Sequence, residues 1–196
     1  AERARRVAEE AVSTAERIEG PWARVWALAG VAGALARAGL TGEALSVAER
    51  IEEPWARADA LVGVAGALAR AGDAERARRV AEEAVSTAER ISGIWKLMLV
   101  PTLAEAACAL TRADLTDEAL AVTERIKDLE GRARALAGVA EALARAGAID
   151  EAREIVTTIN EPGSRSRAQS AVIEALVRKG SSNEAVDMLR AALAEV

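Results

Sequence analysis

The chain has 196 residues, of which 51% are apolar and 29% charged, and its formal net charge of −5 argues against nucleic-acid binding, which needs a basic surface. One cysteine and no histidine exclude a disulfide framework, a catalytic triad and a His-based metal site, so we expect neither a cofactor nor catalysis. No apolar run approaches the roughly 18 residues needed to span a bilayer, so we expect no membrane insertion, and the single thiol fits a reducing cytoplasm.

The first predicted element is a helix over residues 1–18, in which apolar residues recur at helical spacing between Glu and Arg. The same 18 residues return letter for letter at 74–91. Such identity indicates either recent duplication or design from a repeated module. Both copies exceed the other predicted second helices by seven residues, which is two helical turns, so we expect them to project beyond their neighbours.

A six-residue segment, ALARAG, marks the end of one helix in every later unit. It occurs at 34–39, 67–72 and 142–147, with degenerate copies at 109–114 and 175–180. Gly39 and Gly72 are 33 residues apart, and so are Gly147 and Gly180. A fixed period of this length predicts an array of stacked helix pairs.

The chain therefore reads as an orphan helix followed by five helix pairs, or about eleven helices. The predicted units are 21–53, 54–92, 93–128, 129–161 and 162–196. Pro21, Pro54 and Pro162 open first helices, and Gly39 ends one in the left-handed conformation.

The predicted second helices begin at capping side chains. Thr41, Asp73 and Thr116 are the expected N-caps. In the third unit, Pro101 should either bend the first helix near Leu97 or restart it, and we favour the bend.

Each unit places Gly or Asp five residues before an Ala and four residues after a Leu. The Gly/Asp–Ala pairs are Gly39/Ala44, Gly72/Ala77, Asp114/Ala119, Gly147/Ala152 and Gly180/Ala185. This pattern resembles the tetratricopeptide repeat, a helix–turn–helix unit of 34 residues. The sequence departs from the family in its period of 33 and in having Ala, Thr, Val or Leu where the second helix usually has an aromatic residue. Pentatricopeptide repeats share the turn, but they bind RNA and are usually basic.

The resemblance implies one all-α domain over 1–196, a right-handed solenoid that binds proteins or peptides on a concave face lined by the first helices. Carried over position by position, it predicts three rows of binding residues. Those near helix starts are Trp26, Asp59, Arg134 and Arg167; those at the middle are Gly33, Gly66, Cys108, Glu141 and Glu174; those near the ends are Arg37, Arg70, Arg112, Arg145 and Arg178. These positions differ between units, as a ligand surface should, although unconstrained solvent positions would differ too.

Several alternatives stay open at this point. The recurring Arg could form a ladder for acidic partners or could only favour the helix dipole. Trp26 is the best single hot-spot candidate, unless it is buried against the first helix. Trp22, Trp55 and Trp95 are expected to staple helix starts onto the preceding helix, and Cys108 to fill space. The competing function is self-association, end to end or about a two-fold axis, through an exposed first helix. A designed array with no natural ligand is a third possibility.

Overall fold

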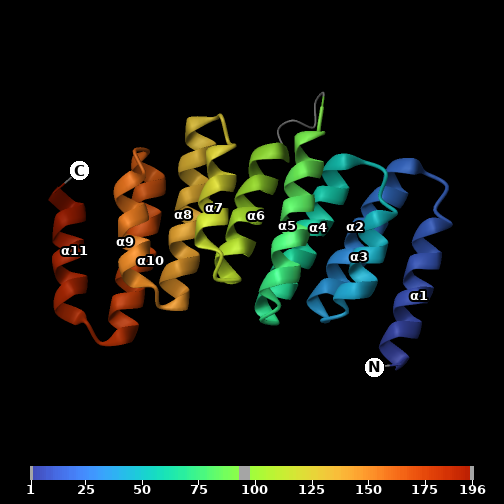
Figure 1. Ribbon diagram of the computed structural model, residues 1–196, viewed down its shortest axis with the longest axis horizontal. Helices are drawn as coiled ribbons and strands as arrows, with labels where there is room; N and C mark the ends of the chain where they lie inside the picture. Colours follow the sequence, from blue (N-terminus) through green and yellow to red (C-terminus); the bar gives the residue numbers. More distant parts are fainter. Residues whose placement is uncertain (1, 93–97, 195–196) are drawn as a thin grey trace.

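The computed structural model describes residues 2–92 and 98–194, which form eleven α-helices and no strand within those ranges. The helices are α1 (Glu2–Glu16), α2 (Pro21–Arg37), α3 (Thr41–Glu49), α4 (Pro54–Arg70), α5 (Ala74–Glu89), α6 (Leu99–Arg112), α7 (Thr116–Glu124), α8 (Leu129–Ala146), α9 (Ile149–Thr158), α10 (Pro162–Lys179) and α11 (Ser182–Ala194). Figure 1 shows them stacked side by side along one long axis, with the two termini at opposite ends. The predicted all-α solenoid is confirmed.

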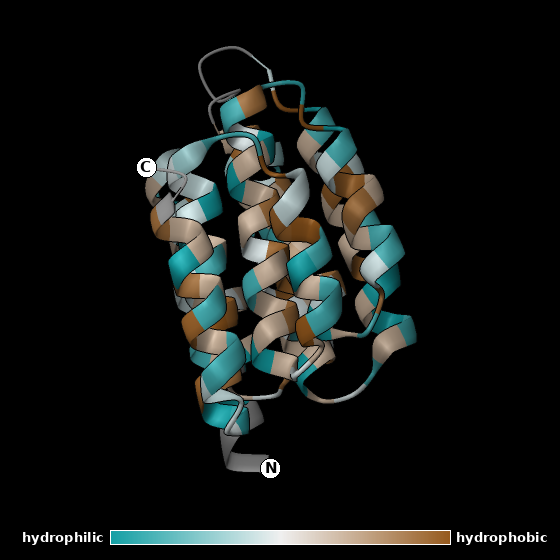
Figure 2. Cartoon of the chain, turned by 90° about the vertical axis from the view of Figure 1, so that its left-hand side faces the viewer, coloured by the Kyte–Doolittle hydropathy of each residue, from teal (hydrophilic) through white to brown (hydrophobic). Residues whose placement is uncertain are grey.

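The first helices of the five units form a continuous layer. In this layer α2 packs on α4, α4 on α6, α6 on α8 and α8 on α10, while α3, α5, α7, α9 and α11 each pack on the first helix of their own unit. Seen along the stack, the helices nearest the viewer carry both hydrophilic and hydrophobic residues (Figure 2). One side of the first-helix layer is thus covered by second helices, and the other side is left as a surface made by first helices alone.

The turn between the two helices of a unit has the same geometry five times. The residue after the Gly or Asp donates its backbone N–H to the carbonyl of the recurring Leu five positions earlier, at 2.9–3.0 Å. These bonds join Leu40 to Leu35, Asp73 to Leu68, Leu115 to Leu110, Ala148 to Leu143, and Ser181 to Leu176. This is the Schellman arrangement, which requires a left-handed residue at the turn. Gly39, Gly72, Gly147 and Gly180 supply it with φ between 78° and 91°.

The third unit makes the same turn with Asp114 at φ 63°, the one positive φ outside glycine among the described residues. The Ala that follows five positions later is buried in every unit. A methyl group at that place lets the second helix begin directly against the first. The ALARAG segment is therefore the structural frame of the repeat.

Two of the three predicted caps are wrong. Asp73 does cap α5, because its carboxylate accepts the backbone N–H of Arg76 at 3.2 Å. Thr41 and Thr116 instead lie inside their helices, whose N-cap residues are Leu40 and Leu115 and have no side-chain cap. The N-cap is the residue directly after the left-handed one, where the second unit has Asp73 but the first and third units have Leu.

The long second helix is confirmed: α5 has 16 residues, whereas α3 and α7 have nine each. The bend expected near Leu97 falls outside the described residues. The described part of that helix begins at Leu99, which places Pro101 in the first turn. Since the N–H groups of a first turn have no partner within the helix, the proline costs no hydrogen bond there.

An arginine near the start of the first helix ties three of the five units to the helix before them. The Nε–H groups of Arg24, Arg132 and Arg165 donate to the carbonyl oxygens of Ile18, Ile126 and Ile159, at 3.1, 3.0 and 2.7 Å. In the second unit, Arg57 pairs with Glu83 of α5 instead, with 2.9 Å between Nη2 and Oε1. Sequence reasoning missed this role, although the repeat placed an Arg six residues after each of these Ile.

Further ion pairs cross between the ends of second helices. Arg50 pairs with Glu16 at 2.7 Å, and Arg125 donates its Nε–H to Glu89 at 2.8 Å. Both pairs are half exposed, so each contributes little to stability, on the order of 0–1 kcal/mol.

The core consists mainly of Ala, Val and Leu, and two helices approach especially closely. A Cβ built on Gly138 of α8 would lie 2.8 Å from the Sγ atom of Cys108 on α6, and one on Gly131 would lie 2.5 Å from a Val100 methyl carbon. The third and fourth units therefore depend on glycine for their contact. At the matching position of α4, Gly63 has open space around it.

The left-handed aspartate predicts a stabilising substitution. Changing Asp114 to Gly should raise the free energy of unfolding by about 0.5–1 kcal/mol, because glycine adopts a positive φ without the steric cost of a side chain. Urea denaturation followed by circular dichroism would measure the change, and Gly72→Asp is the matched reverse substitution. Earlier unfolding of the Asp114→Gly variant would contradict the turn geometry.

Two equivalent glycines should respond oppositely to alanine. Gly63→Ala should stabilise α4 by up to about 1 kcal/mol, the usual gain from replacing a helix-interior glycine. Gly138→Ala should lose that gain and destabilise the chain, because the new methyl group meets the Cys108 sulfur. The same denaturation experiment compares the two, and equal effects at both positions would show that α6 and α8 can separate at no cost.

Candidate functional site

Every residue predicted to bind a partner belongs to a first helix, and we call the surface made by first helices alone the first-helix face. On α2, α4, α8 and α10 the predicted positions follow one another seven and then four residues apart, and on α6 four apart, which places them on one side of each helix. On α4, for example, they are Asp59, Gly66 and Arg70. The structure divides this face into two halves of different electrostatic character.

The N-terminal half holds a cavity of about 230 Å³ between α2, α4 and α6. Arg37, Arg70 and Arg112 line it, one from the last turn of each helix. All three guanidinium groups are exposed, and none forms an ion pair or a hydrogen bond with another described residue. Three like charges on adjacent helices create a strongly positive site in a protein of net negative charge.

The floor of this cavity is made of small residues. Gly33, Gly63, Gly66 and Ala109 line it together with Val62, and Glu105 of α6 is the one acidic residue of the lining. Because these residues hardly protrude, an incoming main chain could come close to the helix backbones. Sequence reasoning missed Gly63 and Glu105; they lie seven residues before Arg70 and Arg112, on the same sides of α4 and α6.

The C-terminal half is neutralised from within. Glu141 of α8 is buried, and it accepts from Arg145 at 2.8 Å and from Arg167 of α10 in a short contact. Glu141 was expected at the open floor, and its burial corrects that expectation. Arg145 and Arg167 are exposed, but each forms an ion pair with the Glu141 carboxylate.

The remaining predicted residues of this half are partly occupied too. Arg134 pairs with Glu130 one turn earlier on α8 at 2.8 Å, and Arg178 donates to the carbonyl of Ala144 at 3.5 Å, which is near the limit of a hydrogen bond. Glu174 is exposed. The row of arginines is therefore not uniform: an open group lies at α2, α4 and α6, and an engaged one at α8 and α10.

Two tryptophans lie at the N-terminal end of the face. Trp26 is 58% exposed, so its burial against the first helix is excluded, and its ring lies 4.7 Å from that of Trp55, with the planes tilted by 56°. Trp55, at the start of α4, is 3% exposed, and its expected packing on the preceding helix remains a prediction. Trp22, its counterpart on α2, is half exposed, and Trp95 lies outside the described residues.

Asp59 follows Trp55 by one helical turn and belongs to the same region. The residue is exposed, but neighbouring atoms keep water from part of its carboxylate, and this desolvation raises the pKa of Asp59 above its ordinary value.

Cys108 is half-buried in α6 against Gly138. Burial, as the main cause, raises the pKa of its thiol, with Glu105 and Glu141 acting in the same direction. A raised pKa disfavours the thiolate that a nucleophile needs. The side chain fills space between two helices.

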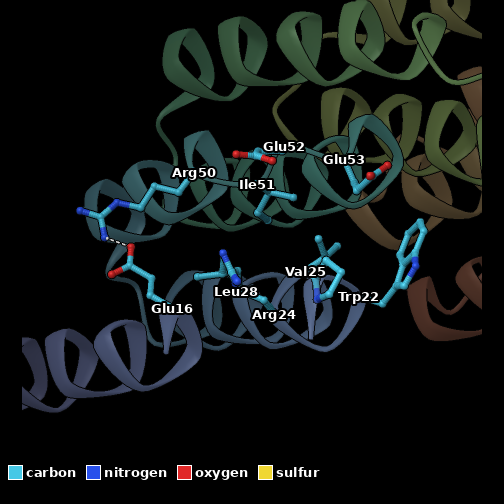
Figure 3. A pocket seen from close by; sticks show the side chains of 10 residues that line it. Glu16, Trp22, Arg24, Val25, Leu28, Arg50, Ile51, Glu52 and Glu53 are labelled. Atoms are coloured by element: carbon cyan, nitrogen blue, oxygen red, sulfur yellow. Dashed lines mark hydrogen bonds and ion pairs between the residues drawn. The ribbon is translucent and has the colours of Figure 1, made fainter. Parts of the chain in front are cut away.

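A larger cavity, of about 450 Å³, lies away from the predicted face, between the end of α1, the start of α2 and residues 50–53 (Figure 3). Its apolar lining includes Val25, Leu28 and Ile51, and the Arg50–Glu16 ion pair closes one end. Trp22 stands at the other end. Arg24, whose guanidinium holds the Ile18 carbonyl, lines the cavity as well.

Comparison with known proteins bears on the fold. No protein-family model matches the chain, and no curated protein matches it either. Among the described residues, none of the helices combines the length and apolar character that crossing a membrane demands.

Two solved structures are similar to the chain over most of its length. Both contain the nearly identical TPR-like repeats of a Podosopora anserina protein assigned as a kinesin light chain, one of them as a variant. Each has 19% identity and a TM-score of 0.52, and the match covers 91% or 90% of this chain and 96% of the other. The observed helix pairs and the similarity to these two structures show that the chain has the fold of a tetratricopeptide-like repeat solenoid.

Proposed function

We propose that the chain is a protein-binding scaffold and that the N-terminal half of its first-helix face binds a peptide segment rich in carboxylates. The observation that carries this proposal is the cavity lined by Arg37, Arg70 and Arg112. Guanidinium groups bind carboxylates with two parallel hydrogen bonds, which gives direction as well as charge.

The shape of the site supports a peptide partner. The glycine floor lets an extended main chain lie across three adjacent helices, as in other modes of peptide recognition. Trp26 offers an exposed indole on α2, the first of these helices. Aromatic and arginine side chains together are typical of binding hot spots. The other predicted binding residues would lie beside the bound partner, because most of them already form ion pairs within the protein. They are Arg134, Arg145, Arg167, Glu141 and Glu174.

Charge reversal in the cavity should abolish binding. Peptides selected on the immobilised chain from a random-peptide phage library are expected to carry Asp and Glu. The double variant Arg70→Glu/Arg112→Glu should bind them at least about tenfold more weakly, because repulsion replaces two charge-assisted contacts. Fluorescence anisotropy with labelled synthetic peptides would measure the dissociation constants.

The matched control is Arg79→Glu, an exposed arginine on α5, which should leave binding unchanged. The same peptides test Trp26→Ala, which should weaken binding while the helical circular dichroism stays intact, because the ring is mostly exposed. Undiminished binding by the double variant would exclude the arginine cavity as the site.

Self-association is the second candidate function, and one observation favours it. Val186, Leu189 and Leu193 are exposed on α11, at the C-terminal end of the stack. Apolar residues in such a row commonly mark a contact surface. If copies of the chain meet there, the molecular mass from light scattering should rise with concentration and fall back to that of a monomer in Leu189→Asp. A constant monomeric mass would exclude this candidate.

A further inference from the structure

The chain contains the same helix twice in two different environments. Residues 2–16 form α1 and residues 75–89, identical in sequence, lie in α5. α5 packs between two first helices, α4 before it and α6 after it, whereas α1 has only α2. α5 therefore shows what a helix of this sequence binds when both of its apolar sides are covered.

One side of the helix is buried in α5 and open in α1. Val80 is 7% exposed, whereas its counterpart Val7 is 56% exposed. Thr87 is buried and Thr14 is exposed. By contrast, Ala88 and Ala15 are both buried, because the side that turns toward the following first helix is covered in each case.

The ion pair between Arg57 and Glu83 identifies the helix that covers the open side. Arg57 belongs to α4 and Glu83 to α5, with 2.9 Å between Nη2 and Oε1. Val80 and Thr87 lie three residues before and four residues after Glu83, so all three share the side that faces α4. The corresponding side of α1 consists of Val7, Glu10, Ala11 and Thr14; we call it the open α1 face.

We propose that the open α1 face binds a helix of the α4 type. Such a helix is rich in Ala, Gly, Val and Leu and carries an arginine in its first turn, as α4 does. Its small residues allow the close packing seen between α4 and α5, and its arginine pairs with Glu10 as Arg57 pairs with Glu83. This surface lies at the end of the stack, apart from the arginine cavity, so it would give the scaffold a second partner.

The test uses the full chain and a labelled synthetic peptide with the sequence of residues 52–73. Fluorescence anisotropy should show saturable binding, and hydrogen exchange should slow at the backbone amides of α1. Val7→Asp should weaken binding about tenfold or more, because it places a charge in an apolar contact. Val7 is exposed in the free chain, so this variant should fold normally.

A charge swap makes the assignment specific. The Glu10→Arg variant should bind the peptide several-fold more weakly and should recover binding when the peptide carries glutamate in place of Arg57. The matched control is Glu9→Arg: Glu9 turns toward α3, where it lines a cavity with Leu35 and Val47, so its reversal should have no effect.

Three results would overturn the proposal. They are the absence of saturable binding, binding that neither Val7→Asp nor Glu10→Arg weakens, and a dimer of the chain in which the α1 amides are already protected. The double variant Arg70→Glu/Arg112→Glu should still bind this peptide, so the α1 face and the arginine cavity can fail separately.

Discussion

Every unit of this protein depends on one turn, in which a residue with positive φ brings the chain back across the helix it has just completed. The hydrogen bond from the next residue to the recurring Leu closes the turn, and the Ala five positions on fills the space where the two helices meet. Because the turn is identical in five units, the angle between the helices is set locally. The stack then grows by repetition, as in other solenoids.

Small side chains allow this repetition to produce a tightly packed layer. The core contains many alanines, and glycine at 131 and 138 lets α8 approach α6 to within contact of Cys108 and Val100. Where the glycine at the same position has open space, as at Gly63, it instead forms the floor of the arginine cavity. Glycine at equivalent positions thus allows close helix packing in the fourth unit and lines a surface cavity in the second.

The first-helix face gains its character from the places where the units differ. Substituting Glu at position 141 for the Gly of the first two units brings in a buried carboxylate, and this carboxylate binds the arginines around it. The first two units lack such a carboxylate, so Arg37 and Arg70 stay open. Glu141 therefore accounts for the pairing of Arg145 and Arg167, while Arg134 and Arg178 have other partners.

The sequence by itself determined the helix count, the helix pairing, the turn residues and the long α5, because these follow from local periodicity and from glycine's tolerance of positive φ. Its errors were local as well: Thr41 and Thr116 were taken for caps because the tightness of the turn was not visible in the pattern. The right-handed sense of the solenoid remains a prediction.

Only the tertiary structure decided which charged residues are open. Arg145 and Arg37 occupy equivalent positions in the repeat, but only Arg145 has a carboxylate partner, Glu141, which also pairs with Arg167 of the neighbouring helix. The helices α1 and α5 also differ in burial although their sequences are identical: α5 is covered by first helices on both sides, and α1 is not. The pairs Arg167–Glu141 and Arg57–Glu83 join residues 26 positions apart, and local sequence does not specify such contacts.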